Sequence, residues 1–205
     1  MSDWLDKQKE RDSRWVVARG WDDDNTLTHL IWMTPEQVEN WIQFSDCVIN
    51  DITHKMNRYE MPLSIFVGFD RNMQNIVFAQ GLLADECKHS HSWFFRQIIE
   101  ATGIHPTVII TDSDPAVDAT VKEVFIMTYP IHCAFHITQN LHKNLRKPLG
   151  NQYEKFFQDF YLCRNSIVQT TFYDHFAKLI ENYLQSKCYL EGLHTHQKSI
   201  GCIHI

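Results

Sequence analysis

The sequence lacks several features that would assign it to a protein class at once. No apolar stretch is long enough to cross a membrane, and the polar start, Met1 to Lys7, lacks the apolar core of a secretory signal peptide. Excess positive charge is missing too: the formal net charge is −6, which disfavours a protein that coats nucleic acid by neutralising phosphates. The 6 cysteines form no dense framework, and no segment repeats. These absences predict an intracellular protein with reduced thiols.

Apolar and aromatic residues, in contrast, are plentiful. Hydrophobic residues make up 44% of the 205 residues, with 13 Phe, 7 Tyr and 6 Trp, which argues against disorder throughout the chain. Apolar periodicity and capping residues predict a hairpin at 15–33, helices at 34–44, 91–102, 114–125, 134–147, 153–161 and 172–184, and strands at 47–52, 63–69, 76–83, 107–112 and 128–133. Three antiparallel strands followed by alternating units predict an α/β fold with helices packed on a mixed sheet.

This order divides the chain into four predicted segments. Residues 1–45 form a lead-in of hairpin and helix, and residues 46–148 form the α/β core. Residues 149–190 form a helical segment whose aromatic stripes pack helix on helix, and residues 191–205 form an irregular tail. RNase H-like folds have this order of elements, but the pattern alone leaves several α/β folds open.

Two aspartates stand out by their positions. Asp51 interrupts an apolar strand, where a carboxylate is disfavoured and its burial is costly. Asp112 ends a buried strand, and open α/β sheets bind ligands at the carboxyl ends of their strands. If the two strands are neighbours, the carboxylates converge on one or two Mg²⁺ or Mn²⁺ ions, which prefer oxygen ligands. Two alternatives stay open: Asp112 as a turn or cap residue like Asp114, and Asp51 as a solvent-facing side chain.

Cys133 and His136 form a C-x-x-H pair at a strand-to-helix junction, and both residue types are zinc ligands. Only half of a zinc site is visible, so a buried cysteine and a locally bonded histidine form the simpler interpretation. Further ligands would have to come from nearby or C-terminal residues, namely His132, His142, His194, His196, Cys202 and His204.

The helix predicted at 134–147 has two different faces. Its apolar stripe consists of Ile137, Leu141 and Leu145, and its other side carries His142, Lys143, Arg146 and Lys147. A basic face beside an acidic metal site suits a DNA phosphate backbone, although such a face is often simply solvated.

Several segments, in order, resemble those of Mutator-like element (MULE) transposases. Residues 51–63 match D-x-T-x-K-x-N-x-Y-x-x-P-L, and VGFD at 67–70 and FAQGLLADE at 78–86 continue that segment. SWFF at 92–95 resembles the aromatic helix of the family, and VIITDSDPA at 108–116 resembles the segment around its second catalytic acid. CAFHITQNL at 133–141 resembles its C-x-x-H-I-x-x-N-L motif. The resemblance runs from about Trp15 to Leu190.

This resemblance implies an RNase H-like fold and a DDE-type transposase catalytic domain. Asp51 takes the position of the first catalytic acid and Asp112 that of the second, with Mg²⁺ or Mn²⁺ as the cofactor. DNA at transposon ends is the implied partner, and the nucleus is the implied location. Lys143, Arg146 and Lys147 are the candidate contacts to the DNA backbone.

The sequence also departs from the family pattern. The resemblance implies that residues 149–190 are part of a helical insertion. The third acid, a Glu in an S-T-x-x-S-E-like segment beyond that insertion, is not found, and Glu86, Glu181 and Glu191 lie in no matching motif. Ile52 is bulkier than the usual residue after the first acid, and the upstream zinc-finger-type DNA-binding module is not found. The truncated helical pair would leave apolar surface that favours self-association.

Two other functions are compatible with these residues. Plant light-signalling regulators of the far-red response type resemble MULE transposases over this region and act as DNA-binding transcription factors. A domesticated regulator of that kind need not keep Asp51 and Asp112, so their presence favours the transposase interpretation. The remaining hypothesis is an interaction module that uses the aromatic helices.

We expect this chain alone to have no transposase activity. With one of three carboxylates missing, the affinity for metal and the geometry of the site should both suffer. A strand-transfer assay on DNA with matching terminal repeats measures this, and robust product would contradict the expectation.

Overall fold

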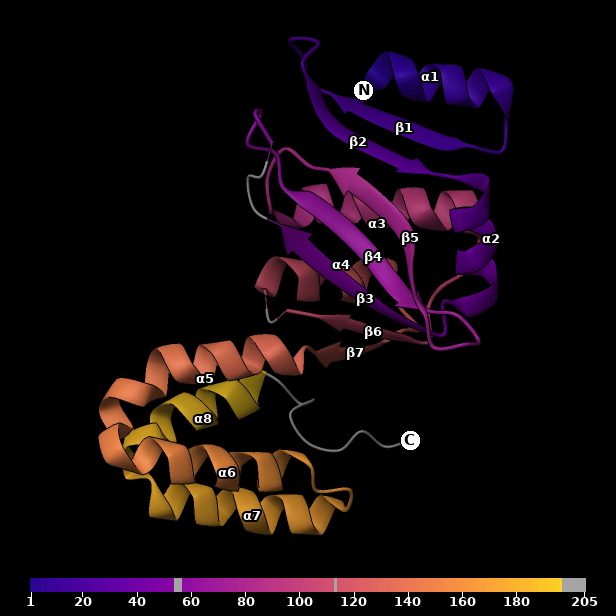
Figure 1. The fold of residues 1–205 in the computed structure, drawn as a ribbon. Helices are drawn as coiled ribbons and strands as arrows, with labels where there is room; N and C mark the ends of the chain where they lie inside the picture. Colours follow the sequence, from indigo (N-terminus) through magenta and orange to yellow (C-terminus); the bar gives the residue numbers. More distant parts are fainter. Residues whose placement is uncertain (54–56, 113, 197–205) are drawn as a thin grey trace. The chain divides into compact units, whose positions relative to one another are not determined.

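A computed structural model describes residues 1–53, 57–112 and 114–196 (Figure 1). The chain divides into two compact units, Met1–Pro130 and the residues from Ile131 onward. The elements up to the boundary are α1 (Ser2–Arg11), β1 (Val16–Trp21), β2 (Leu27–Met33), α2 (Pro35–Phe44), β3 (Cys47–Thr53), β4 (Leu63–Phe69), β5 (Asn75–Leu82), α3 (Lys88–Thr102), β6 (Val108–Thr111), α4 (Pro115–Val124) and β7 (Tyr129–His132), which straddles the boundary.

A seven-stranded mixed sheet forms the frame, with strand order β1-β2-β5-β4-β3-β6-β7. Strands β3, β4 and β5 form an antiparallel meander, and β6 joins β3 in parallel. Counted from β3 as the first strand, the order from β5 to β7 is third, second, first, fourth and fifth, which is the RNase H-like order. The predicted fold is therefore confirmed. The predicted hairpin is also present, and it lengthens the sheet because β2 pairs with β5.

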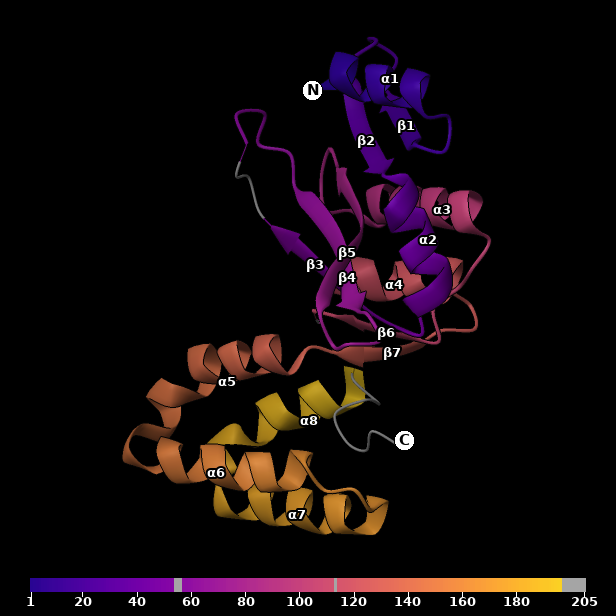
Figure 2. The same ribbon diagram turned by 45° about the vertical axis from the view of Figure 1, so that its right-hand side comes forward.

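Three helices cover one face of this sheet and enclose the core (Figures 1 and 2). Phe66 of β4 lies at the centre of a cluster of rings, with its centroid 5.4 Å from that of Trp41 in α2 and 5.0 Å from that of Phe95 in α3. Helix α4 adds Val117 and Val121 to the same cluster. Edge-to-face aromatic packing of this kind stabilises a core beyond the burial of area alone.

Capping residues start these helices where the sequence predicts. Thr34 and Gln37 form a capping box at the start of α2, and Asp114 accepts hydrogen bonds from the backbone N–H groups of Ala116 and Val117 at the start of α4. Gly103 ends α3 with a φ of 69°, a left-handed conformation that suits glycine.

Helix α1 was not predicted in the lead-in, which was expected to hold only a hairpin and a helix. It packs on the face of β1 opposite the core: Ala18 contacts the core, while the guanidinium of Arg19 donates to Asp6 at 2.8 Å and to the Ser2 hydroxyl at 3.0 Å. Leu5 of α1 is fully buried. The segment has little apolar periodicity, so its helix was missed by a search for amphipathic stripes.

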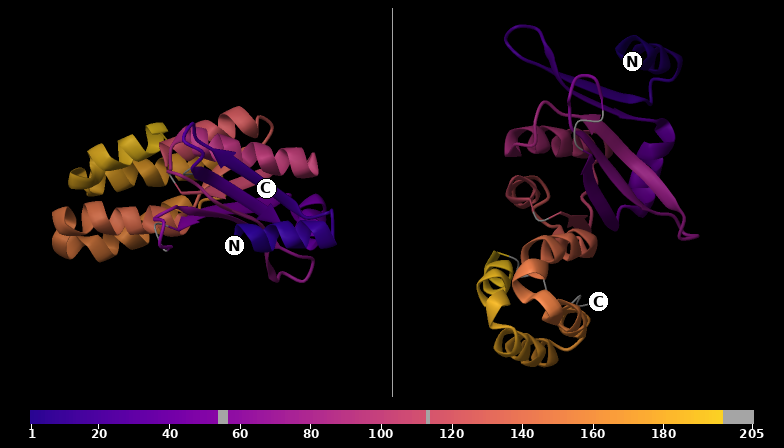
Figure 3. Two further views of the ribbon diagram at one scale, coloured as in Figure 1. Left: turned by 90° about the horizontal axis from the view of Figure 1, so that it is seen from above. Right: turned by 60° about the vertical axis from the view of Figure 1, so that its left-hand side comes forward.

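The second unit is helical (Figure 3). Its elements are α5 (Ala134–Leu149), the 3-10 turn η1 (Gly150–Gln152), α6 (Tyr153–Arg164), α7 (Gln169–Asn182), the 3-10 turn η2 (Leu184–Ser186) and α8 (Lys187–His196). The predicted aromatic stripes do form its core, in which Phe156 packs edge-to-face on Tyr183. Leu184, the last residue of the predicted helix 172–184, is 70% exposed and lies outside this core.

Two boundaries differ from the prediction. The apolar stripe of α5 joins the core of this helical unit, so the compact units divide at Pro130 rather than at residue 148. Helix α8 continues to His196, although an irregular tail was predicted from residue 191. Within the described residues, no helix is both long and apolar enough to cross a membrane.

Candidate functional site

Asp51 lies in β3 on the face of the sheet away from the core. Side chains alternate along a strand, so Val48 and Asn50 point into the core while Ile49 and Asp51 point away from it. The Asp51 side chain is exposed. The cost of burying a carboxylate, which helped to single out Asp51 in the sequence, therefore does not apply to this exposed side chain.

Asp112 follows β6 directly and is half-buried. One of its carboxylate oxygens accepts a long hydrogen bond of 3.4 Å from the backbone N–H of Asp114. Asp114 is the helix cap, as the sequence predicts, because it binds the first two N–H groups of α4. Asp112 thus occupies the turn between the strand and the helix cap.

The register of β3 against β6 relates the two aspartates. The parallel ladder pairs Cys47 with Val108, Val48 with Ile109 and Ile49 with Ile110. Continuing that register by two residues sets Asp51 level with Asp112, and level residues of parallel strands face the same side. Neighbouring strands are about 4.8 Å apart. The two positions therefore meet the condition for convergence that the sequence left open, namely that their strands are neighbours.

A buried polar layer lies on the core side of the two aspartates. The Asn50 amide donates to the Ser64 hydroxyl at 2.9 Å and to the Ile65 carbonyl at 3.2 Å, and Ser64 is fully buried. Thr111 is 1% exposed, and its hydroxyl has no partner among the described residues. Sequence reasoning missed this layer. The available signal was a polar residue immediately before each aspartate in an apolar strand.

His91, in the first turn of α3, is a buried titratable residue that sequence reasoning missed. It is fully buried, and its Nε2 lies 3.1 Å from the Glu86 carbonyl, which can only accept. Nδ1 is then the unprotonated nitrogen, and it has no partner among the described residues. Burial lowers the pKa of His91, and the carboxylates of Asp114 and Asp112 oppose that shift. The neutral imidazole therefore lies within electrostatic range of the turn that holds Asp112.

Another polar cluster joins β2 to the start of α3. The Ser90 hydroxyl donates to Asp85 at 2.6 Å, so its oxygen accepts from Nε2 of His29 at 2.9 Å. Hydrogen bonds from Cys87 and Ser90 lower the pKa of Asp85 from 3.8 to about 2. Ser90 is 1% exposed and gives its proton to the carboxylate rather than to the imidazole. This Ser-His-Asp group therefore lacks the hydrogen-bond order of a nucleophilic triad, and its bonds connect β2 to the start of α3.

The C-x-x-H pair lies at the start of α5. Cys133 is the N-cap residue of α5, although its side chain makes no cap hydrogen bond. His136 is in the first turn, and both side chains are partly buried. The described residues contain no set of three or more His, Cys, Asp or Glu side chains able to hold a metal ion. The His142 ring instead packs at a tilt against the rings of Tyr153 and Phe157, with centroid distances of 5.3 Å and 5.0 Å. Cys202 and His204 lie outside the described residues.

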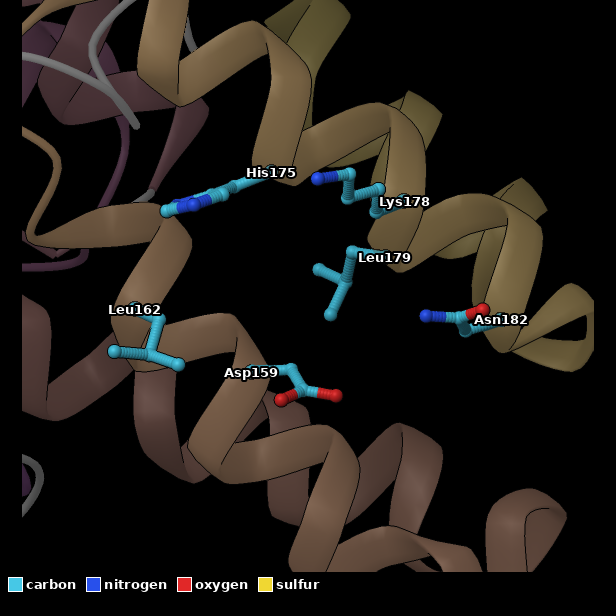
Figure 4. Close-up of a pocket in the computed structure, with 6 residues that line it drawn as sticks. All are labelled: Asp159, Leu162, His175, Lys178, Leu179 and Asn182. Carbon is cyan, nitrogen blue, oxygen red and sulfur yellow. The ribbon is translucent and has the colours of Figure 1, made fainter.

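Lys143, Arg146 and Lys147 are exposed on α5, opposite its buried leucines. Elsewhere in the helical unit, side chains of α6 and α7 line a hollow (Figure 4). The carboxylate of Asp159, which lines this hollow, accepts a hydrogen bond from the Tyr183 hydroxyl at 2.7 Å. Burial, and secondarily this bond, raises the pKa of Tyr183 to about 12. This acid is therefore engaged in holding the two helices together.

Comparison with known proteins finds a family match over part of the chain. Residues 47–140 match the family model of the MULE transposase domain, so the predicted resemblance is confirmed over that span. The chain is 24% identical over 204 residues to Protein FAR1-RELATED SEQUENCE 4 of Arabidopsis thaliana, covering 96% of this chain and 27% of that protein. It is 23% identical over 199 residues to Protein FAR-RED IMPAIRED RESPONSE 1 of the same plant, covering 96% of this chain and 24% of that protein.

Other matches are shorter or more distant. Protein FAR1-RELATED SEQUENCE 5 of Arabidopsis thaliana is 28% identical over 144 residues, which is 70% of this chain and 18% of that protein. The catalytic core domain of BIV integrase is 14% identical, covers 74% of this chain and 97% of its own, and superposes with a TM-score of 0.33. That superposition is too loose to support any argument about function. The chain spans about a quarter of the length of the first two relatives.

We predict that Asp85→Asn destabilises the first unit at neutral pH by about 1 kcal/mol or less, because the carboxylate is screened by solvent. A folded-state pKa of about 2 lies below the unfolded value of 3.8, so this stability is present above pH 3.8 and lost as the pH falls towards 2. Urea denaturation across that range measures the difference from wild type.

Asp24→Asn provides the matched control. Among the described residues, Asp24 takes part in a side-chain hydrogen bond only through its backbone N–H, and its carboxylate accepts none. Its denaturation curve should follow that of the wild type at every pH. If the difference in the free energy of unfolding between Asp85→Asn and the wild type stays constant down to pH 2, the charge of Asp85 does not stabilise the fold.

Proposed function

We propose that this chain, whose residues 47–140 match the MULE transposase domain, supplies two carboxylates of a DDE-type site that holds divalent metal over DNA phosphodiesters. The observation that supports this proposal is the register of β3 against β6, which sets Asp51 level with Asp112 on neighbouring strands. A regulator without metal chemistry has no need of two aspartates at matching positions on adjacent strands.

The chemistry of these side chains fits Mg²⁺ or Mn²⁺. Carboxylate oxygens are the ligands that such hard cations prefer, and the Asp51 side chain is exposed. When bound in such a site, divalent metal stabilises the charge on the attacking and leaving oxygens of a phosphodiester. The contribution of the chain itself is to hold the two carboxylates on a rigid sheet, braced from the core side by the bonds of Asn50 to Ser64 and to Ile65.

Two carboxylates form an incomplete set, and the described residues offer no third ligand beside them. We therefore propose that the chain alone binds metal weakly and performs no strand transfer, because the family's third acid is not found in its sequence. A zinc site at Cys133 and His136 would likewise be incomplete, because these two ligands belong to no group of three or more His, Cys, Asp or Glu among the described residues.

A second candidate is a domesticated, DNA-binding transcriptional regulator. It is favoured by the names of the similar plant proteins, which are a far-red impaired response protein and its relatives. Both candidates imply DNA as the partner and the nucleus as the location. Tight sequence-specific DNA binding without metal binding would support the regulator.

The helical unit supplies two surfaces to either function. Lys143, Arg146 and Lys147 project from α5 into solvent, where a phosphate backbone can reach them. Leu162 and Ile167, near the α6–α7 turn, are 64% and 83% exposed, and we propose this apolar surface as the site of self-association.

We predict that the wild-type chain binds Mn²⁺ and that Asp51→Asn or Asp112→Asn weakens binding by about tenfold or more, since each substitution removes a charged oxygen ligand. Isothermal titration calorimetry with Mn²⁺ measures this directly. Asp24→Asn, at the far turn of the β1–β2 hairpin, should bind as the wild type does. Equal Mn²⁺ affinity in all four proteins would remove the basis of the proposed site.

We also predict that Arg146→Ala weakens DNA binding mainly at low salt. Log K falls as log salt concentration rises, and each lost phosphate contact makes that slope less negative by about 0.9. Fluorescence anisotropy with duplex DNA over a range of salt concentrations measures that slope. Lys122→Ala, an exposed position on α4, should leave the slope unchanged. If the slope is also unchanged in Arg146→Ala, α5 does not contact the backbone.

A further inference from the structure

A short described segment, Asn57–Met61, lies at the same end of the sheet as the two aspartates. It belongs to the connection between β3 and β4, whose ends meet because Thr53 pairs with Leu63. Asp51 is two residues before the end of β3, and the parallel strand β6 ends beside it, so this connection leaves the sheet where the proposed metal site lies.

The side chain of Asn57 fixes the conformation of this segment. Its carbonyl oxygen accepts from the backbone N–H groups of Tyr59 at 3.0 Å and Met61 at 3.3 Å, and its amide donates to the Met61 carbonyl at 2.6 Å. Glu60 has a φ of 56°, a left-handed conformation that costs energy in a residue other than glycine. The Pro62 carbonyl, which follows the segment, then accepts a hydrogen bond from the backbone N–H of Leu83 at 3.0 Å. This bond connects the segment to the end of β5.

Two exposed side chains project from this fixed segment. Tyr59 is 65% exposed, so it contributes little to any core. The guanidinium carbon of Arg58 lies 4.6 Å from the centroid of the Tyr59 ring, and the guanidinium also donates to the Tyr59 hydroxyl. The pair therefore presents an aromatic ring and a positive charge together, on a backbone that is already ordered.

We propose that Arg58 and Tyr59 bind an unpaired nucleotide of DNA, with the base stacked on the tyrosine ring and the guanidinium beside the phosphate. The inference rests on the proposed function, because it names the substrate of the same site. Bases within a duplex already stack on each other, so an exposed ring selects bases that have left the helix. The positive charge matters because the chain as a whole is acidic, with a net charge of −6.

The location of the pair explains why an unpaired nucleotide is the fitting ligand. A strand whose phosphodiester lies over Asp51 and Asp112 has its flanking nucleotides at this end of the sheet. Base–aromatic stacking tolerates any sequence, since every base has a π-face. The pair therefore holds the strand end without reading its sequence.

The test uses the full chain and a DNA duplex with an unpaired end that carries 5-iododeoxyuridine, which crosslinks to stacked aromatic rings under ultraviolet light. We expect a crosslink at Tyr59, located by mass spectrometry. Tyr59→Ala should lose the crosslink and about tenfold in affinity for this DNA, while Tyr59→Phe keeps both because it keeps the ring. Tyr129→Ala, an exposed tyrosine of β7, provides the control and should behave as the wild type.

Affinity unchanged in Tyr59→Ala, or a crosslink at another residue, would overturn the stacking proposal. Equal losses for the unpaired and the fully paired DNA would do the same, because they would show a general loss of binding. Failure of the metal site has a different signature. A wild-type chain that crosslinks through Tyr59 yet binds no Mn²⁺ in calorimetry would end the metal proposal and support the stacking surface.

Discussion

The parallel pairing of β3 with β6 is the contact on which the candidate site depends, because residues far apart in the sequence meet only across it. The pairing sets Cys47 against Val108, and every later position on the two strands follows from that register. A shift of one residue would turn one aspartate towards the core and leave the other in solvent. The register is held by burial of Val48 and Ile109, both fully enclosed by the aromatic core beneath the sheet. The hydrophobic core and the polar site are thus two faces of the same pair of strands.

The polar residues on the core side of the sheet need hydrogen-bond partners, which an apolar core does not require. Asn50 is satisfied by Ser64 and by a backbone carbonyl, whereas Thr111 and Nδ1 of His91 are buried without a partner among the described residues. Groups of this kind cost free energy unless something satisfies them. Their concentration where β6 ends and α3 begins is more typical of a functional region than of a packing core, and it coincides with the position of Asp112.

Much of the fold could be predicted from local pattern, and the site only in part. Strand periodicity and the caps at Thr34 and Asp114 are local signals, so the order of elements followed from them. Helix α1 has little apolar periodicity. The assignment of α5 to the helical unit depends on a shared core, which includes Phe156 and Tyr183 and which no local pattern reveals. The roles of Asp51 and Asp112 were suggested by family resemblance more than by physics. His91 was missed because its burial depends on how α3 meets the sheet.

The β1–β2 hairpin has a consequence for how the sheet ends. Pairing with β2 covers β5, the long third strand of the RNase H-like order, so the outermost strands are β1 and β7. The register of β1 shifts between Gly20 and Trp21, and β7 has only four residues, of which Pro130 has no N–H to donate. Irregular or short outer strands are poor templates for lateral pairing with another chain. A protein with so many β-prone aromatic residues is thereby protected against edge-to-edge aggregation at both margins of its sheet.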